Sequence, residues 1–179
     1  MIADIQRLTD LVPPPSVAPP RPDWSRVSAA LGTEVPPDYV ELIDLYGGGQ
    51  FDGYLWLLEP FSANESYDLV RSYEERTEAL HMLWDDDEPK PDFASPDGVR
   101  LIPWASTDNG EFIYWRAVLG VPARDWTVVV NEARGEEWET FDVGCARFLV
   151  DTMAGAVESE LLWSDYPTDP HTFAPMSSF

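Results

Sequence analysis

Apolar residues recur at helical spacing near the start of the chain and predict three short helices before residue 50. Asp23 is placed to cap the second of these helices, and Gly32 to end it. The third begins at Pro36-Pro37, where a missing N–H costs little, and the glycines at 47–49 end it. The expected buried stripes are Ile2, Ile5, Leu8 and Leu11, then Trp24, Val27 and Leu31, then Tyr39, Leu42, Ile43 and Tyr46.

Between residues 50 and 141 the pattern predicts strands joined by tight turns. Asp52-Gly53 predicts a hairpin turn leading into a strand over 54–58. Asn109-Gly110 predicts a second hairpin between strands 99–106 and 111–116, with positive φ at both turn residues. A third hairpin is expected between strands 126–132 and 137–141.

A long helix is expected over 63–84, because Ser62 and Glu65 have the spacing of a capping box. The residues expected on its inner face are Leu69, Val70, Tyr73, Leu80 and Trp84. The following stretch, 85–98, has no periodicity and predicts an exposed acidic loop.

The last part of the chain predicts a further helix capped by Asp142. Its inward residues are expected to be Cys145, Phe148, Leu149, Thr152 and Met153. A short helix is predicted over 156–163, and the tail from Ser164 is expected to be irregular.

The order of elements predicts an α+β fold: a single domain with a mainly antiparallel sheet and helices packed around it. The length of 179 residues fits one domain. Within it we distinguish an N-terminal helix and Pro-rich linker (1–22), a central part (23–155) and an acidic C-terminal extension (156–179).

Net charge narrows the possible partners. The chain has 11 basic and 33 acidic residues, so its formal charge is 11 − 33 = −22. Such a surface repels nucleic-acid phosphate and anionic membranes and attracts basic proteins. Direct nucleic-acid binding is disfavoured, because that affinity comes largely from Lys and Arg displacing counterions.

The cysteine count and the N-terminal sequence indicate the cellular compartment in which the protein is expected to reside. Cys145 is the only cysteine, so no internal disulfide can form, and a reducing environment is favoured. The N-terminus lacks the features of a signal peptide, and no apolar run approaches the roughly 20 residues of a membrane span. We expect a cytoplasmic protein that does not bind membranes.

Candidate chemistry is sparse. His81 and Asp85 could share a metal on one helix face, but no second histidine or cysteine stands nearby. The acidic run 85–88 has consecutive acids followed by Pro89, which does not fit a calcium loop. Cys145 falls on an apolar helix face, and no GxSxG element is present. The sequence therefore predicts no enzyme activity, no cofactor and no metal.

Three segments together resemble one known family. They are PPDYVELIDLYGGG from Pro36, LIPWASTDNGEFIYW from Leu101 and WETFDVGCARFLVDTM from Trp138. In this order they resemble the SUKH superfamily of Smi/Knr-type proteins, over about residues 23–155. The matching positions are Pro36, Pro37, Tyr39, Gly47, Gly48, Ile102, Pro103, Asp108, Asn109, Gly110, Phe148 and Leu149.

The resemblance implies an antiparallel sheet with packed helices and a variable binding surface, without a catalytic role for the matching residues. It also implies a bacterial immunity protein that neutralises a toxin encoded nearby, which we expect to be a basic, nuclease-type effector. The alternative is a non-enzymatic adaptor of the regulatory Smi/Knr kind. The residues expected to contact the basic partner are Asp85, Asp86, Asp87, Glu88, Asp92 and Asp52.

Overall fold

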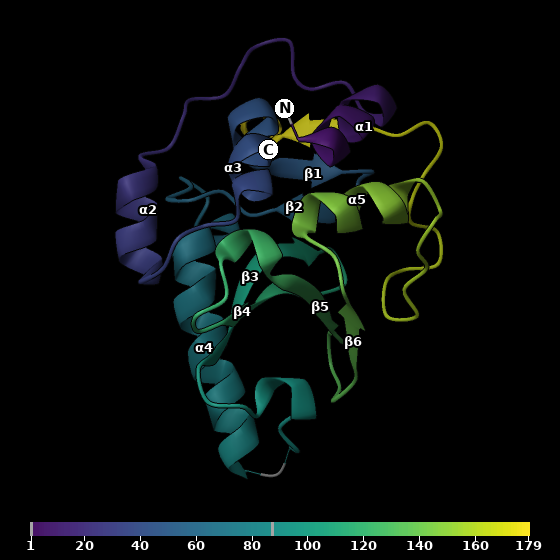
Figure 1. Ribbon diagram of the computed structural model, residues 1–179. Helices are drawn as coiled ribbons and strands as arrows, with labels where there is room; N and C mark the ends of the chain where they lie inside the picture. The colour runs from purple at the N-terminus through teal and green to yellow at the C-terminus, as the bar shows by residue number, and fades with distance from the viewer. Residues whose placement is uncertain (1, 87) are drawn as a thin grey trace.

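The computed structural model describes residues 2–86 and 88–179 and confirms the predicted α+β fold. In these residues, one seven-stranded antiparallel sheet is accompanied by five α-helices and short 3-10 helices (Figure 1). The α-helices are α1 (Ala3–Leu11), α2 (Trp24–Leu31), α3 (Pro37–Tyr46), α4 (Leu69–Asp86) and α5 (Cys145–Met153). The strands are β1 (Gly49–Phe51), β2 (Leu55–Leu57), β3 (Val99–Thr107), β4 (Phe112–Val118), β5 (Thr127–Asn131), β6 (Trp138–Phe141) and β7 (Phe173–Pro175).

The sheet has the spatial order β6-β5-β4-β3-β2-β1-β7. From β1 to β6, each strand pairs with its neighbour along the chain. Short connections join these antiparallel strands, except for β2 and β3, between which α4 lies. β7 breaks this pattern, because it crosses the molecule to pair with β1. Among the described helices, none is long and apolar enough to cross a bilayer.

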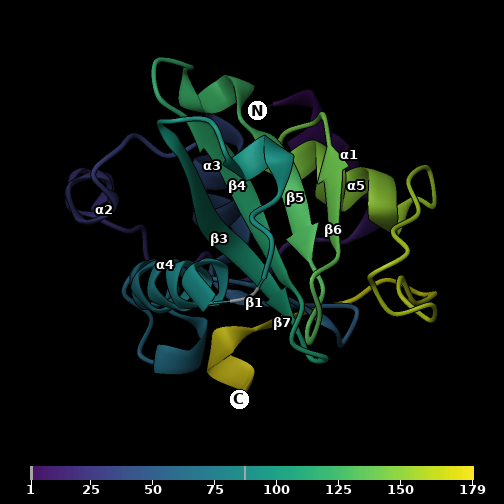
Figure 2. The same cartoon turned by 90° about the horizontal axis from the view of Figure 1, so that it is seen from below.

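The two faces of the sheet bury separate apolar clusters. One face carries Trp104 and Trp115 and is covered by helices α1, α3 and α5. The other carries Leu101 and Tyr114, against which Leu80 of α4 packs. Figure 2 shows α4 on the side of the sheet opposite α3 and α5. The sheet therefore separates the main core from a smaller core beneath α4.

The β3–β4 hairpin confirms the predicted pairing of 99–105 with 111–116, but its turn differs from the prediction. Thr107 accepts a hydrogen bond from Gly110 N–H at 3.1 Å and donates its own N–H to Glu111 at 3.0 Å. Gly110 has a φ of +101°, whereas Asn109 does not adopt a positive φ. The loop thus has three residues, with the glycine alone in the left-handed region.

The long helix starts later than predicted. A 3-10 helix, Glu65–Tyr67, precedes α4, because Asn64 caps it by accepting from Ser66 N–H at 3.2 Å. Asp68 then caps α4 by accepting from Arg71 N–H at 2.8 Å, so the Ser62–Glu65 capping box was wrong. The helix also continues through Asp86, which the sequence had placed in the loop.

The C-terminal part differs most from expectation. Segment 156–163 forms bends and irregular backbone instead of the predicted helix, and part of the tail forms strand β7 and the 3-10 helix Met176–Ser178. Asp142 is exposed and does not cap α5, whose N-cap position is Gly144. A carboxylate from α3, Asp38, supplies that cap instead.

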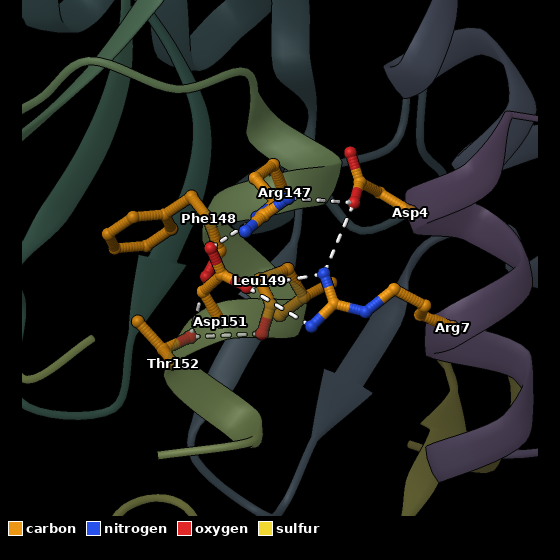
Figure 3. A network of polar contacts seen from close by, with 7 residues as sticks. All are labelled: Asp4, Arg7, Arg147, Phe148, Leu149, Asp151 and Thr152. Atoms are coloured by element: carbon orange, nitrogen blue, oxygen red, sulfur yellow. Dashed lines mark hydrogen bonds and ion pairs between the residues drawn. The ribbon is translucent and has the colours of Figure 1, made fainter. Parts of the chain in front are cut away.

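A polar network joins the first and last α-helices (Figure 3). Arg7 of α1 contacts Asp151 of α5 at 3.4 Å, and Arg147 of α5 contacts Asp4 of α1 at 3.7 Å. Asp151 also pairs with Arg147, although its side chain is only 6% exposed. Two arginines satisfy this buried carboxylate, so the N-terminal helix is fixed to α5 by charge as well as by apolar packing.

Candidate partner-binding surface

The solvent-facing side of α4 carries a row of acidic residues. Leu69, Ser72 and Leu80 mark the buried side of this 18-residue helix. The opposite side is exposed and holds five carboxylates, which we call the α4 acidic face: Glu74, Glu75, Glu78, Asp85 and Asp86. Helical spacing gathers these residues, because positions three or four apart lie one above another.

The end of α4 places negative charge where the helix already has a negative dipole end. Asp85 and Asp86 occupy the last turn, which contains no basic residue. Carboxylates are unfavourable there, since the unpaired carbonyls of the last turn carry partial negative charge. Helix stability therefore does not account for the acidic residues at this end.

An apolar side chain accompanies the acidic face. Met82 is 62% exposed and lies one turn after Glu78. A shallow depression on the outer side of the helix is lined by Met82 together with Glu74, Glu78 and Asp85. An exposed methionine within a charged rim is the composition of many protein interfaces, where methionine is enriched.

The acidic residues predicted from the sequence gather around this helix end. Asp85 and Asp86 are exposed in α4, Asp92 is exposed at the start of the 3-10 helix Asp92–Ala94, and Glu88 is half-buried. Asp87 lies outside the described residues. Within the described part of the chain, the other four have no side-chain hydrogen bond or ion pair, so they are available to a partner.

Asp52 has a different environment. It lies in the β1–β2 turn with a φ of +50°, and its side chain is fully buried. Its carboxylate accepts from the N–H groups of Thr168 and Thr172 at 3.2 and 2.7 Å, and it lies 2.9 Å from His171 Nδ1. Asp52 therefore binds residues of the C-terminal tail, and the structure does not bring it together with the residues around Asp85.

The other candidates for chemistry have structural surroundings. His81 and Asp85 line the same depression, but no set of three or more potential ligands among residues 2–86 and 88–179 could hold a metal. Cys145 is buried, and burial raises the pKa of its thiol well above the ordinary value, with the carboxylate of Asp38 adding to the effect. A thiol in this environment is a poor nucleophile.

Sequence reasoning missed the middle of the acidic face. Glu74, Glu78 and Met82 recur every four residues and therefore fall on one side of α4. The sequence contained this signal, because a helical projection of 63–84 places them opposite the predicted apolar stripe.

Comparisons with protein-family models, with curated proteins and with solved structures found no significant match.

Proposed function

We propose that this chain is a non-catalytic binding protein that neutralises a basic protein toxin by covering the surface on which the toxin acts. The observation that carries the proposal is the unpaired acidic cluster at the end of α4, at Asp85, Asp86 and Asp92. The resemblance of three segments to SUKH immunity proteins supports it independently of the charge.

The physical basis is electrostatic complementarity. A nuclease-type toxin needs a basic surface to hold nucleic-acid phosphate, and a row of carboxylates can occupy that surface in place of phosphate. Complementary charges also raise the association rate of two proteins. In this interface, Met82 would be the apolar contact, and carboxylates of the α4 acidic face would lie beside it.

Co-expression with the toxin encoded beside this gene tests the proposal. Wild-type protein should restore growth, whereas a Glu78→Gln, Asp85→Asn, Asp86→Asn variant should restore it much less. The matched control is Asp142→Asn, Glu158→Gln, Asp169→Asn, which removes the same charge from exposed positions elsewhere. Failure of the wild type to protect would overturn the function, and equal protection by both variants would overturn the surface.

Association kinetics separate charge steering from simple loss of contact. The α4 variant should associate with the toxin severalfold more slowly than wild type at low salt. The difference should shrink at 1 M salt, where the Debye length is about 3 Å. Wild-type rates at both ionic strengths would place the interface elsewhere on the molecule.

A further inference from the structure

A pocket lies on the inner side of α4, between the C-terminal half of this helix and strand β3. Its volume is about 190 Å³, and its apolar wall includes Leu80, Trp84, Ala94 and Leu101. A cavity of roughly 150 Å³ is enough to hold benzene. This pocket therefore has room for one six-membered ring with a short substituent.

The charge of the pocket is opposite to that of the protein. None of the residues that line it is acidic, although the chain carries 33 acidic and 11 basic residues. Lys90 and Arg100 line it instead, and Lys90 is the only lysine in the sequence. Among the described residues, neither cation has an ion pair with a carboxylate. The pocket is therefore a cationic site within a strongly acidic protein.

The two cations are held by neutral groups. The ammonium of Lys90 lies 5.2 Å from the centroid of the Trp84 ring. Arg100 donates from Nη1 to the carbonyl oxygen of Leu31 at 2.9 Å. These contacts position both cations without neutralising them, so an anion that enters the pocket would meet uncompensated positive charge.

A third polar group in the lining lacks a partner. The Oγ1 atom of Thr77 is buried and has no hydrogen-bond partner within the described residues. Buried hydroxyl groups are nearly always hydrogen-bonded, so such an exception calls for a ligand or an ordered water. Because Thr77 lines the same pocket as the two cations, one acceptor group entering the pocket can satisfy it.

We propose that this pocket binds a small aromatic monocarboxylate. The ring would lie against the aliphatic side chains of the pocket wall, and the carboxylate would accept a hydrogen bond from Thr77. Lys90, beside Trp84, and Arg100, beside Tyr73, would attract it by charge from the two ends of the pocket. The pocket shares Tyr73, Thr77 and His81 with the depression beside the α4 acidic face, but the proposal uses none of the carboxylates and does not rest on the proposed function.

Benzoate is the probe, and titration by calorimetry together with ligand-observed NMR is the measurement. For a ligand of this size, we expect saturable binding with a Kd of roughly 0.1–1 mM. Benzamide, which is neutral and has nearly the same shape, should bind at least about tenfold more weakly. Benzamidine, which is cationic, should not bind.

Variants locate the site. Lys90→Gln and Thr77→Val should each weaken benzoate binding severalfold, and Arg134→Gln, an exposed arginine distant in sequence, is the control and should leave binding unchanged. Thr77→Val keeps the shape of the side chain and removes a hydroxyl without a partner, so its thermal stability should equal or exceed that of the wild type. A loss of binding in this variant would therefore not reflect unfolding.

Three results would overturn the proposal: no saturable binding at about tenfold above the expected Kd, equal affinity for benzoate and benzamide, or wild-type affinity in both pocket variants. Equal affinity for the neutral ligand would identify the pocket as a purely apolar cavity. Selective binding of benzoate that both pocket variants weaken would establish the site.

Discussion

The Oδ2 atom of Asp38 accepts a hydrogen bond from the backbone N–H of Ala146 at 3.0 Å and so joins α3 to the first turn of α5. Gly144 occupies the N-cap position and has no side chain that could cap this turn. A Cβ atom at Gly144 would lie 2.8 Å from the same Asp38 oxygen, so the glycine allows the close approach. One carboxylate therefore caps a helix from a distant part of the chain.

Replacing Asp38 should destabilise the fold. Asp38→Ala is expected to lower the free energy of unfolding by about 1–2 kcal/mol, because the first turn of α5 loses its cap. Asp142→Ala, at the exposed residue that the sequence favoured as the cap, should cost less than about 0.5 kcal/mol. Urea denaturation measures both values, and equal effects would contradict the assignment of the cap.

Asp52→Asn should loosen the tail. Asparagine tolerates the positive φ at this position, so the change isolates the loss of a carboxylate that accepts from Thr168 and Thr172. We expect a loss of about 1–3 kcal/mol and faster amide hydrogen exchange at these threonines, because asparagine keeps only one acceptor oxygen for their two N–H groups. Asp169→Asn, an exposed change in the same tail, is the control. Unchanged exchange in Asp52→Asn would show that Asp52 does not hold the tail.

Neutralising the end of α4 should stabilise the folded chain. Asp85→Asn combined with Asp86→Asn removes two charges from the negative end of the helix dipole. The expected gain is roughly 0.3–1 kcal/mol at low ionic strength, and it should diminish as salt is added. Asp165→Asn with Asp169→Asn removes equal charge from exposed tail positions and should give a smaller gain in the same thermal melts. A loss of stability in the α4 variant would show that these carboxylates support the fold.

Alkaline pH should unfold the protein through its buried tyrosines. Burial raises the pKa of Tyr54 from its ordinary value of 10.0 to about 12, and burial also raises the pKa of Tyr46. Between pH 10 and about pH 12, the Tyr54 hydroxyl loses its proton in the unfolded chain but keeps it in the folded chain. The contribution of Tyr54 to stability is therefore constant below about pH 10 and falls as pH rises toward 12, by up to about 1.4 kcal/mol per pH unit.

Tyrosinate absorbance recorded alongside circular dichroism checks this dependence. The buried tyrosines should ionise together with unfolding rather than before it. Tyr54→Phe should reduce the loss of stability between pH 10 and 12, although it also removes the hydrogen bonds of the hydroxyl with Glu111 and with Trp163 N–H. Ionisation of Tyr54 in a chain that remains folded would contradict the prediction.

The parts of the fold that could be predicted depend on signals close together in the sequence. The cap at Asp23 accepts from Ser25 and Arg26 N–H as expected, and Gly32 adopts a φ of +64°. The hairpins were similarly recognisable, because turn residues and alternating strands lie side by side along the chain. By contrast, the cap at Asp38 and the strand Phe173–Pro175 depend on partners far away, and a short segment that ends in proline has no strand signal of its own.

The candidate surface was predictable in composition but not in shape. The acidic run after Trp84 was visible, yet its first two members belong to a helix that continues to Asp86. The pocket beneath α4 could not be predicted, because Thr77, Lys90 and Arg100 come from a helix, a connecting segment and a strand. Only their packing brings an unpartnered hydroxyl and two cations together.

The pairing of β7 with β1 has a consequence for the order of folding. Strands β1 and β2, and strands β3 to β6, are joined by short loops, and the β2–β3 pair must close the segment that contains α4. Strand β7 must close a loop that contains most of the sheet. Loop-closure entropy makes such pairing slow relative to local hairpins. We expect the edge between Gly49–Phe51 and Phe173–Pro175 to be the last part of the sheet to form, and pulse-labelled hydrogen exchange would detect its late protection. Until it forms, β1 is an open strand edge, so an early folding intermediate is the state in which this protein is most exposed to pairing with other chains.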